Sequence, residues 1–206
     1  MGTPDVTNWR PLTPPDAAAI MDGYPGPWWI SGGWAVEAFT GTPRLHGDLD
    51  VECLRDDLAL LRRHLAARYE LWSAHSGSLT PLPPDDRPDA QADDVLPPGT
   101  NQIWARPDAA SPWECDLMLS RSSAEIWVYK RDPSITMPMR QALWERDGVR
   151  YLCPELQLLH KAKAVRPKDQ ADFDAVIPLL DGDRRAWLRD AIARVRPDHP
   201  WLGRLA

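Results

Sequence analysis

Two aspartates separated by one residue, Asp48 and Asp50, occur in an apolar run that predicts a strand over Asp48–Leu54. Alternate side chains of a strand share a face, so the two carboxylates would lie about 7 Å apart at their Cα atoms, with Leu49 and Val51 pointing into the core. Two carboxylates on one face can share Mg²⁺, which prefers oxygen ligands and retains phosphate oxygens as further ligands. A solvated strand end has the same pattern, so the pair alone leaves both interpretations open.

A glycine pair lies fifteen residues earlier, where Ser31-Gly32-Gly33 separates the apolar run Trp28–Ile30 from a helical pattern over Trp34–Phe39. A helix that begins after such a turn has unpaired backbone N–H groups at its first residues. Phosphate binds to these groups without side chains, and glycine allows close approach. Ser31 would add a hydroxyl. A simple tight turn is the alternative for this stretch.

A third aspartate, Asp116, interrupts the strand-like run Trp113–Leu119 and would share its face with Glu114 and Met118. Burying an aspartate in an apolar strand is costly unless it is paired or binds a metal ion. If this strand lies beside that of Asp50, three carboxylates converge. Two-metal nucleotidyl transfer requires this arrangement, and Asp116 would be placed to accept the proton of an attacking hydroxyl.

Composition restricts the class of protein. The 206 residues carry a formal net charge of −6, which disfavours a general nucleic-acid binder and suits a small cationic acceptor. Cys53, Cys115 and Cys153 are widely spaced, so we expect reduced thiols rather than disulfides or a zinc site. The sequence shows no apolar leader and no long apolar run, from which we expect a cytoplasmic protein without a membrane span.

The remaining pattern predicts an α+β fold with a domain over residues 1–150 and a helical subdomain over residues 151–206. The expected helices are Ala17–Met21, Trp34–Phe39, Arg55–Arg68, Pro154–Val165, Asp169–Leu180 and Asp183–Val195. Further strands are expected over Glu70–Ser73, Asn101–Arg106, Trp113–Leu119 and Glu125–Lys130, with the last two forming a hairpin.

The segment over residues 75–100 is rich in proline and aspartate and too long for an ordinary connector. We expect either a lid over a site or a mobile insertion. Its acidic residues would engage a cationic acceptor or form a solvated loop; they are Asp85, Asp86, Asp89, Asp93 and Asp94.

The combined pattern resembles a known superfamily. Gly-Gly, Asp-x-Asp on the next strand and a later strand aspartate are similar to the nucleotidyltransferase superfamily that includes DNA polymerase β. The stretches GGWAVE and RLHGDLDV resemble the aminoglycoside 2″-adenylyltransferase-like family, which includes lincosamide nucleotidyltransferases. WVYKRDPSI and YLCPELQLLHKAKAVRPKDQADFD resemble it too, so the likeness covers residues 28–182.

This resemblance implies a nucleotidyltransferase-type mixed β-sheet flanked by helices, with a small C-terminal helical part. It implies that Asp48, Asp50 and Asp116 form the catalytic metal site, with two Mg²⁺ ions, and that Asp116 completes this site or acts as general base. The triphosphate of ATP or another NTP would contact the remaining site residues, Ser31, Gly32, Gly33, Arg44, His46, Lys161, Lys163 and Lys168.

Some of these residues also have structural interpretations. Arg44 and His46 would contact phosphate or support the metal site, and His46 alone would be a surface or hydrogen-bonded histidine. The basic run that contains the lysines could be a solvated face. Asp169 and Asp172 match the acidic pair of the family and could pair with Arg166 or Lys168.

The resemblance implies an enzyme that transfers a nucleoside monophosphate, AMP from ATP in the leading hypothesis, to a hydroxyl of a small acceptor and releases pyrophosphate. An aminoglycoside- or lincosamide-like acceptor is expected, without a membrane partner and without nucleic acid. Two alternatives stay open: a toxin-like nucleotidyltransferase acting on tRNA or protein, and a non-catalytic nucleotide-binding relative. Retention of Asp48, Asp50 and Asp116 argues against the latter.

Overall fold

The computed structural model describes residues 5–10, 12–83 and 92–205. Its strands are β1 (Trp28–Ile30), β2 (Asp50–Leu54), β3 (Glu70–His75), β4 (Ser78–Leu82), β5 (Gln102–Arg106), β6 (Cys115–Ser120), β7 (Ile126–Val128), β8 (Thr136–Pro138), β9 (Leu143–Arg146) and β10 (Val149–Leu152). Its α-helices are α1 (Pro14–Ile20), α2 (Gly32–Thr40), α3 (Leu58–Leu65), α4 (Ala92–Val95), α5 (Met139–Ala142), α6 (Pro154–Lys161), α7 (Pro167–Val176) and α8 (Gly182–Val195). Short 3₁₀ helices span Arg55–Asp57, Ile177–Leu179 and Pro200–Arg204.

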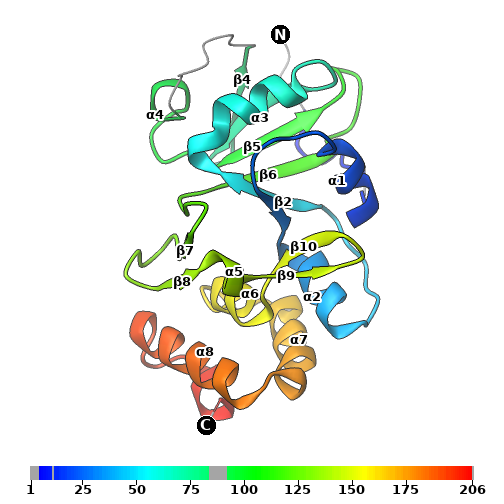
Figure 1. The fold of residues 1–206 in the computed structure, drawn as a ribbon. Coiled ribbons are helices and arrows are strands. Elements are labelled where there is room, and N and C mark those ends of the chain that lie inside the picture. Colours follow the sequence, from blue (N-terminus) through cyan, green and yellow to red (C-terminus); the bar gives the residue numbers. More distant parts are fainter. Residues whose placement is uncertain (1–4, 11, 84–91, 206) are drawn as a thin grey trace.

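Eight strands form a mixed sheet in the order β4-β3-β5-β6-β2-β1-β10-β9. The pairs β2–β6 and β1–β10 are parallel, and the other neighbours are antiparallel. Helices α1 and α3 lie against the upper part of the sheet, and α6, α7 and α8 gather at the opposite end of the molecule (Figure 1). The expected α+β fold with a mixed sheet flanked by helices is confirmed.

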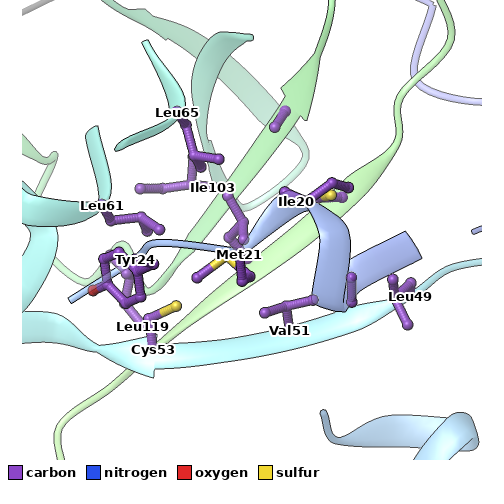
Figure 2. Close-up of a cluster of buried hydrophobic side chains, with 14 of the residues drawn as sticks. Ile20, Met21, Tyr24, Leu49, Val51, Cys53, Leu61, Leu65, Ile103 and Leu119 are labelled. Atoms are coloured by element: carbon purple, nitrogen blue, oxygen red, sulfur yellow. The ribbon is translucent and has the colours of Figure 1, made fainter. Parts of the chain in front are cut away.

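The apolar face of the sheet explains which side chains remain for the site. Val51 and Cys53 of β2 join a buried cluster with residues of α1 and α3, among them Ile20 and Leu61 (Figure 2). Side chains alternate along a strand. Asp50, which precedes Val51, and Glu52, which lies between Val51 and Cys53, therefore belong to the other face. The polar face of β2 is thus fixed by burial of its apolar one.

A second buried cluster joins the sheet to the C-terminal helices. Trp29 of β1 and Trp127 of β7 are almost fully buried in it, together with apolar residues of α6, α7 and α8. Phe173 and Trp201 stack within it with ring centroids 4.3 Å apart. This cluster contains residues from both sides of the predicted domain boundary between residues 150 and 151. The division into two domains at that boundary therefore stays a prediction.

Two features of the predicted strands are wrong. Glu125–Lys130 does not form a hairpin with Trp113–Leu119, because β7 pairs with β8 in a separate two-stranded sheet. The Ser122 hydroxyl oxygen accepts from the Val128 backbone nitrogen (2.9 Å) and thus occupies a donor that a hairpin with β6 would use. Strand β2 begins at Asp50, so Asp48 lies in the preceding loop.

Two hairpins, β3–β4 and β9–β10, were not predicted. Each turns through two residues with positive φ, Ser76-Gly77 and Asp147-Gly148. This conformation matches the twist of paired strands, and Asp-Gly in particular is a strong hairpin signal in a sequence. Residues 75–83 and 92–100 therefore contain hairpin and helix rather than only a lid or insertion. Asp85, Asp86 and Asp89, and the side chains of Asp93 and Asp94, lie outside the described residues.

In the part of the chain that the structure describes, no helix has both the length and the apolar character needed to cross a membrane. The three cysteines are buried, and their thiols are free.

Replacing Leu117 of the central strand β6 with alanine tests this account of the core. Leu117 is fully buried, so Leu117→Ala should lower the free energy of unfolding by about 2–5 kcal/mol. Leu179→Ala is the matched control, because Leu179 is 54% exposed and its truncation should change stability by about 0.5 kcal/mol or less. Urea denaturation followed by tryptophan fluorescence measures both. Equal effects of the two substitutions would contradict the assignment of Leu117 to the core.

Candidate active site

Three carboxylates meet where β2 and β6 lie side by side. Asp50 and Asp116 are directly opposite each other in the parallel pair. Asp48 reaches them from the loop before β2, and one oxygen of each of the three carboxylates lies within 4.8 Å of the others. Asp48 is exposed, Asp50 is half-buried and Asp116 is buried. The structure thus brings together the three aspartates that the sequence singled out.

Burial makes two of these carboxylates, Asp50 and Asp116, difficult to ionise. Desolvation, followed by the charge of Asp48, raises the pKa of Asp50 to about 6. Desolvation and the charge of Asp50 raise the pKa of Asp116 well above its usual range, although a hydrogen bond from Gln102 opposes this. Close carboxylates of one sign repel each other when charged. A bound cation would remove this repulsion.

The donor set fits a divalent metal ion. Asp116 Oδ2 accepts a hydrogen bond from Gln102, whereas Asp116 Oδ1 is buried and has no hydrogen-bond partner among the described residues. A buried oxygen without a partner is costly, and metal coordination would satisfy it. Carboxylate oxygens at this mutual distance are the ligands that Mg²⁺ prefers.

The glycine turn lies against these carboxylates. Gly32 has φ +66°, and a Cβ atom at this residue would lie 1.7 Å from Asp50 Oδ2. A Cβ at Gly33 would lie 1.9 Å from Arg44 Nη2. Gly32 is therefore required by the Asp50 carboxylate and by its own positive φ, whereas a Cβ at Gly33 would displace the Arg44 guanidinium. The turn is held from the C-terminal side, because Gly32 N–H donates to Gln157 Oε1 at 2.8 Å.

This geometry changes the roles expected for Ser31 and Gly32. The Ser31 hydroxyl opposes the rise that desolvation causes in the pKa of the Glu52 carboxyl group and is thus directed to Glu52, and the first backbone N–H of α2 donates to Gln157. The next N–H, that of Gly33, has no hydrogen-bond acceptor among residues 5–10, 12–83 and 92–205. Of the predicted phosphate-binding turn, the Gly33 N–H is the group free for an anion.

Arg44 and His46 make different contacts in the structure. Arg44 Nη1 lies 2.8 Å from Asp172 Oδ1, which fixes the guanidinium between α2 and α7. His46 stacks on Trp34, with ring centroids 3.8 Å apart, and its Nε2 lies 2.7 Å from Glu37 Oε2. His46 therefore packs against α2, and its contacts match the hydrogen-bonded histidine that the sequence allowed as an alternative.

The predicted lysines also divide into two kinds. Lys161 is buried and lies 2.8 Å from Asp172 Oδ2 and 3.4 Å from Asp169 Oδ1. Asp169 also accepts from Arg166 Nε at 2.7 Å, so the expected pairing of the acidic residues includes Arg166 and not Lys168. Lys163 and Lys168 are exposed. The basic run is thus partly a buried ion-pair network and partly a free surface.

Two cavities adjoin the carboxylates. The first, named the basic cavity here, is lined by Gly32, Gly33, Asp48 and Asp50 together with six cationic side chains, those of Arg44, Arg131, Lys161, Lys163, Arg166 and Lys168. The second, named the β7 cavity, is lined by Asp50, Glu52, Met118, Trp127 and Lys130 among others. The two cavities share five residues, Gly32, Asp50, Arg131, Gln157 and His160.

Several residues of these cavities were not predicted from the sequence. Gln157 lies at helical spacing from His160 and from the predicted Lys161 on α6, which was a readable signal for one common face. Glu52 lies two residues beyond Asp50 on the same face of β2, and desolvation raises its pKa to about 7. Burial and the charge of Lys130 lower the pKa of His160 to about 3, so its imidazole is neutral.

The mixed sheet, the glycine turn and the three converging carboxylates, two of them on strands, agree with the nucleotidyltransferase resemblance that the sequence indicated. A basic cavity adjoins them. Comparison with known proteins supports the same resemblance. Residues 16–70 match the family model described as aminoglycoside-2''-adenylyltransferase. A search of curated protein sequences found no significant match.

Three solved structures are similar to the chain over most of its length. The solution structure of the antibiotic-resistance factor ANT(2'')-Ia is 16% identical, with a TM-score of 0.54, and the match covers 90% of each chain. The lincomycin-bound crystal structure of the lincosamide antibiotic adenylyltransferase LnuA is 14% identical, with a TM-score of 0.53, over 84% of this chain and 99% of that one. The crystal structure of ANT(2'')-Ia with adenylyl-2''-tobramycin is 14% identical, with a TM-score of 0.53, over 86% and 93%.

These findings confirm the nucleotidyltransferase fold and the resemblance to the aminoglycoside adenylyltransferase-like family. At 14–16% identity, the solved structures establish the fold, while the family model covers 55 residues that include the glycine turn, Asp48 and Asp50.

Replacing Gly32 with alanine should disrupt the site. The added Cβ would overlap Asp50 Oδ2 and would require a strained backbone conformation, which alone costs about 1–3 kcal/mol. We expect a lower free energy of unfolding and loss of stabilisation by Mg²⁺, both measured by thermal denaturation. Gly47→Ala is the control, because no atom lies within 4 Å of its added Cβ. If Gly32→Ala retained the response to Mg²⁺, the close packing of Gly32 on Asp50 would be contradicted.

Stabilisation by metal should depend on pH. The folded pKa of Asp50, about 6, exceeds the unfolded value of about 3.9. Between these values the folded state binds more protons, so the metal-free protein loses stability as the pH rises. Metal ions require the ionised carboxylates and compete with protons. We therefore expect Mg²⁺ to raise the Tm little at about pH 5 and clearly at about pH 8.

The variant Asp50→Asn serves as the control for this titration. It should be less sensitive to pH in the absence of metal, because the group that resists ionisation has been removed, and it should respond little to Mg²⁺. An Mg²⁺-induced rise in Tm that is equal at both pH values, or unchanged in Asp50→Asn, would argue against the carboxylate site.

Proposed function

We propose that this protein is a divalent-metal-dependent nucleotidyltransferase that transfers a nucleoside monophosphate, AMP from ATP, to a hydroxyl of a small acceptor and releases pyrophosphate. The observation that carries the proposal is the convergence of Asp48, Asp50 and Asp116 beside a basic cavity. Carboxylates and cations that adjoin in this way suit a ligand with a metal-bound phosphate at one end and an anionic tail.

In this proposal Asp48, Asp50 and Asp116 would hold Mg²⁺, which when bound would polarise the reacting phosphate and lower the pKa of the attacking hydroxyl. The basic cavity would receive the β- and γ-phosphates, with Lys163 and Lys168 as exposed cations and the Gly33 N–H as a backbone donor. Binding there orients the triphosphate so that pyrophosphate leaves toward the basic cavity.

Asp116 is the proposed general base. Its Oδ1 atom has no partner among the described residues, while Gln102 holds Oδ2 and thereby fixes the orientation of the carboxyl group. The Asp116 carboxylate would accept the proton of the attacking hydroxyl, whose pKa a bound metal ion would lower.

The acceptor is proposed from the similar proteins. The matched family model names an aminoglycoside adenylyltransferase, and the similar structures contain adenylyl-2''-tobramycin or lincomycin. We propose an aminoglycoside- or lincosamide-like hydroxyl compound for this chain. A tRNA or protein acceptor and a role limited to nucleotide binding are the outcomes against which the proposal is tested.

The test is an assay of pyrophosphate release with each of the four NTPs, Mg²⁺ and a panel of aminoglycosides, lincosamides, tRNA and protein. We expect acceptor-dependent release with ATP and an adenylylated product detected by mass spectrometry. Asp48→Asn and Asp116→Asn should lower kcat about 10²–10⁴-fold, the range expected for loss of a metal ligand or general base.

Asp190→Asn is the matched control, because the Asp190 side chain is 71% exposed on α8 and should leave kcat unchanged. Release that requires tRNA or protein would replace the proposed acceptor class. Nucleotide binding without turnover for every acceptor, or full activity in Asp116→Asn, would overturn the proposed reaction.

A further inference from the structure

Lys130 lies two residues after the end of β7, at the β7 cavity. It lines this cavity together with Asp50 and Glu52. Its positive charge acts on the carboxyl groups of Asp50, Glu52 and Asp116. Within the described residues, Lys130 forms no ion pair with a carboxylate. Lys130 is also exposed, so its ammonium group is accessible to a ligand.

Three of the other cations near the carboxylates are committed to acidic partners. Arg44 and Lys161 bind Asp172, and Arg166 binds Asp169, so these three hold α7 against the rest of the site. They belong to the basic cavity, as do Lys163 and Lys168. Lys130 differs from these five because it lines the β7 cavity, together with Arg121 and Arg131, and does not line the basic cavity.

The turn that carries Lys130 is fixed on both sides. Tyr129 N–H donates to the Ile135 carbonyl at 3.0 Å, which closes the turn, and Tyr129 Oη donates to the Leu159 carbonyl of α6 at 3.3 Å. Arg194 of α8 lies 3.0 Å from Asp132 in the same turn. These contacts hold the backbone of Lys130 in place between the sheet and the C-terminal helices, where β7 and β8 lie in Figure 1.

We propose that Lys130 is a further catalytic residue, whose ammonium group contacts a non-bridging oxygen of the α-phosphate during transfer. The inference rests on the proposed function. If the β- and γ-phosphates occupy the basic cavity and the metal-binding carboxylates hold the α-phosphate, a cation that lines the β7 cavity with Asp50 meets the α-phosphate from that cavity.

The reaction balances without change in the charge of Lys130. The acceptor oxygen forms a bond to the α-phosphorus, and the bond from that phosphorus to the oxygen bridging the β-phosphate breaks. Pyrophosphate leaves with the electron pair, and the hydroxyl proton passes to Asp116. Negative charge on the non-bridging oxygens is stabilised by an ammonium group placed before the reaction starts.

The test compares Lys130→Met and Lys130→Arg with the wild type, using Arg189→Gln as a control for loss of one positive charge on the surface of α8. We expect Lys130→Met to lower kcat for acceptor-dependent pyrophosphate release about 100-fold or more. The Kd of α,β-methylene-ATP with Mg²⁺, measured by calorimetry, should change about threefold or less. The reason is that the contact between the Lys130 ammonium and the α-phosphate oxygen strengthens in the transition state, which the analogue does not reach.

Two further readouts separate a catalytic role from a structural one. Lys130→Arg should recover part of kcat, and Lys130→Met should change the ratio of rates for the two diastereomers of α-thio-ATP. A kcat within about threefold of wild type overturns the proposal, as does a loss confined to nucleotide affinity. A wild-type protein that releases no pyrophosphate with any acceptor overturns the proposed function itself, and the role of Lys130 with it.

Discussion

The parallel pairing of β2 with β6 is the constraint on which the site depends. It sets Asp50 directly opposite Asp116, and the apolar residues that alternate with them are buried on the other face of the sheet. A shift by one residue would turn the carboxylates into the core and the apolar side chains toward the cavities. The hydrophobic core therefore fixes the register, and the register brings the carboxylates together.

Two pairs of buried or half-buried aspartates, Asp169 with Asp172 and Asp50 with Asp116, differ in whether cationic side chains pair with them. Asp169 and Asp172 are as buried as Asp116, yet they are surrounded by Arg166, Lys161 and Arg44. Desolvation raises the pKa of Asp169, but hydrogen bonds from Arg166 outweigh it and lower the pKa overall. This pair is compensated within the chain and joins α7 to the rest of the molecule.

Asp50 and Asp116 lack such compensation. Desolvation is the largest cause of the raised pKa of both groups. No lysine or arginine within the described residues forms an ion pair with either. Perturbed carboxylates without a cationic partner cluster at functional sites, because a ligand supplies the missing charge. The difference in compensation distinguishes the structural pair, Asp169 and Asp172, from the candidate metal-binding pair, Asp50 and Asp116.

The sequence predicted those parts of the site that local pattern determines. Asp50, Asp116 and the glycine turn could be found because strand alternation and the Ser-Gly-Gly break are visible over a few residues. The environment of Lys161 could not, because its partners Asp169 and Asp172 are brought to it by packing of α6 on α7. Gln157 and Lys130 lie more than sixty residues from the carboxylates of β2 in the sequence, so a local pattern does not show that they approach these carboxylates. The β9–β10 hairpin is different, since its Asp-Gly turn was visible and was overlooked.

The acidity of the whole chain carries less information than the charges at the cavities. A net charge of −6 suggested a cationic acceptor, but six cationic side chains line the basic cavity. Charges within a Debye length of about 8 Å dominate binding at physiological salt, so a ligand in this cavity responds to these cations and not to the average over the surface. An anionic triphosphate suits the basic cavity, and the carboxylates beside it suit the metal ions that such a ligand carries. The overall charge therefore says little about the acceptor, whose recognition depends on the side chains that surround its own hydroxyl.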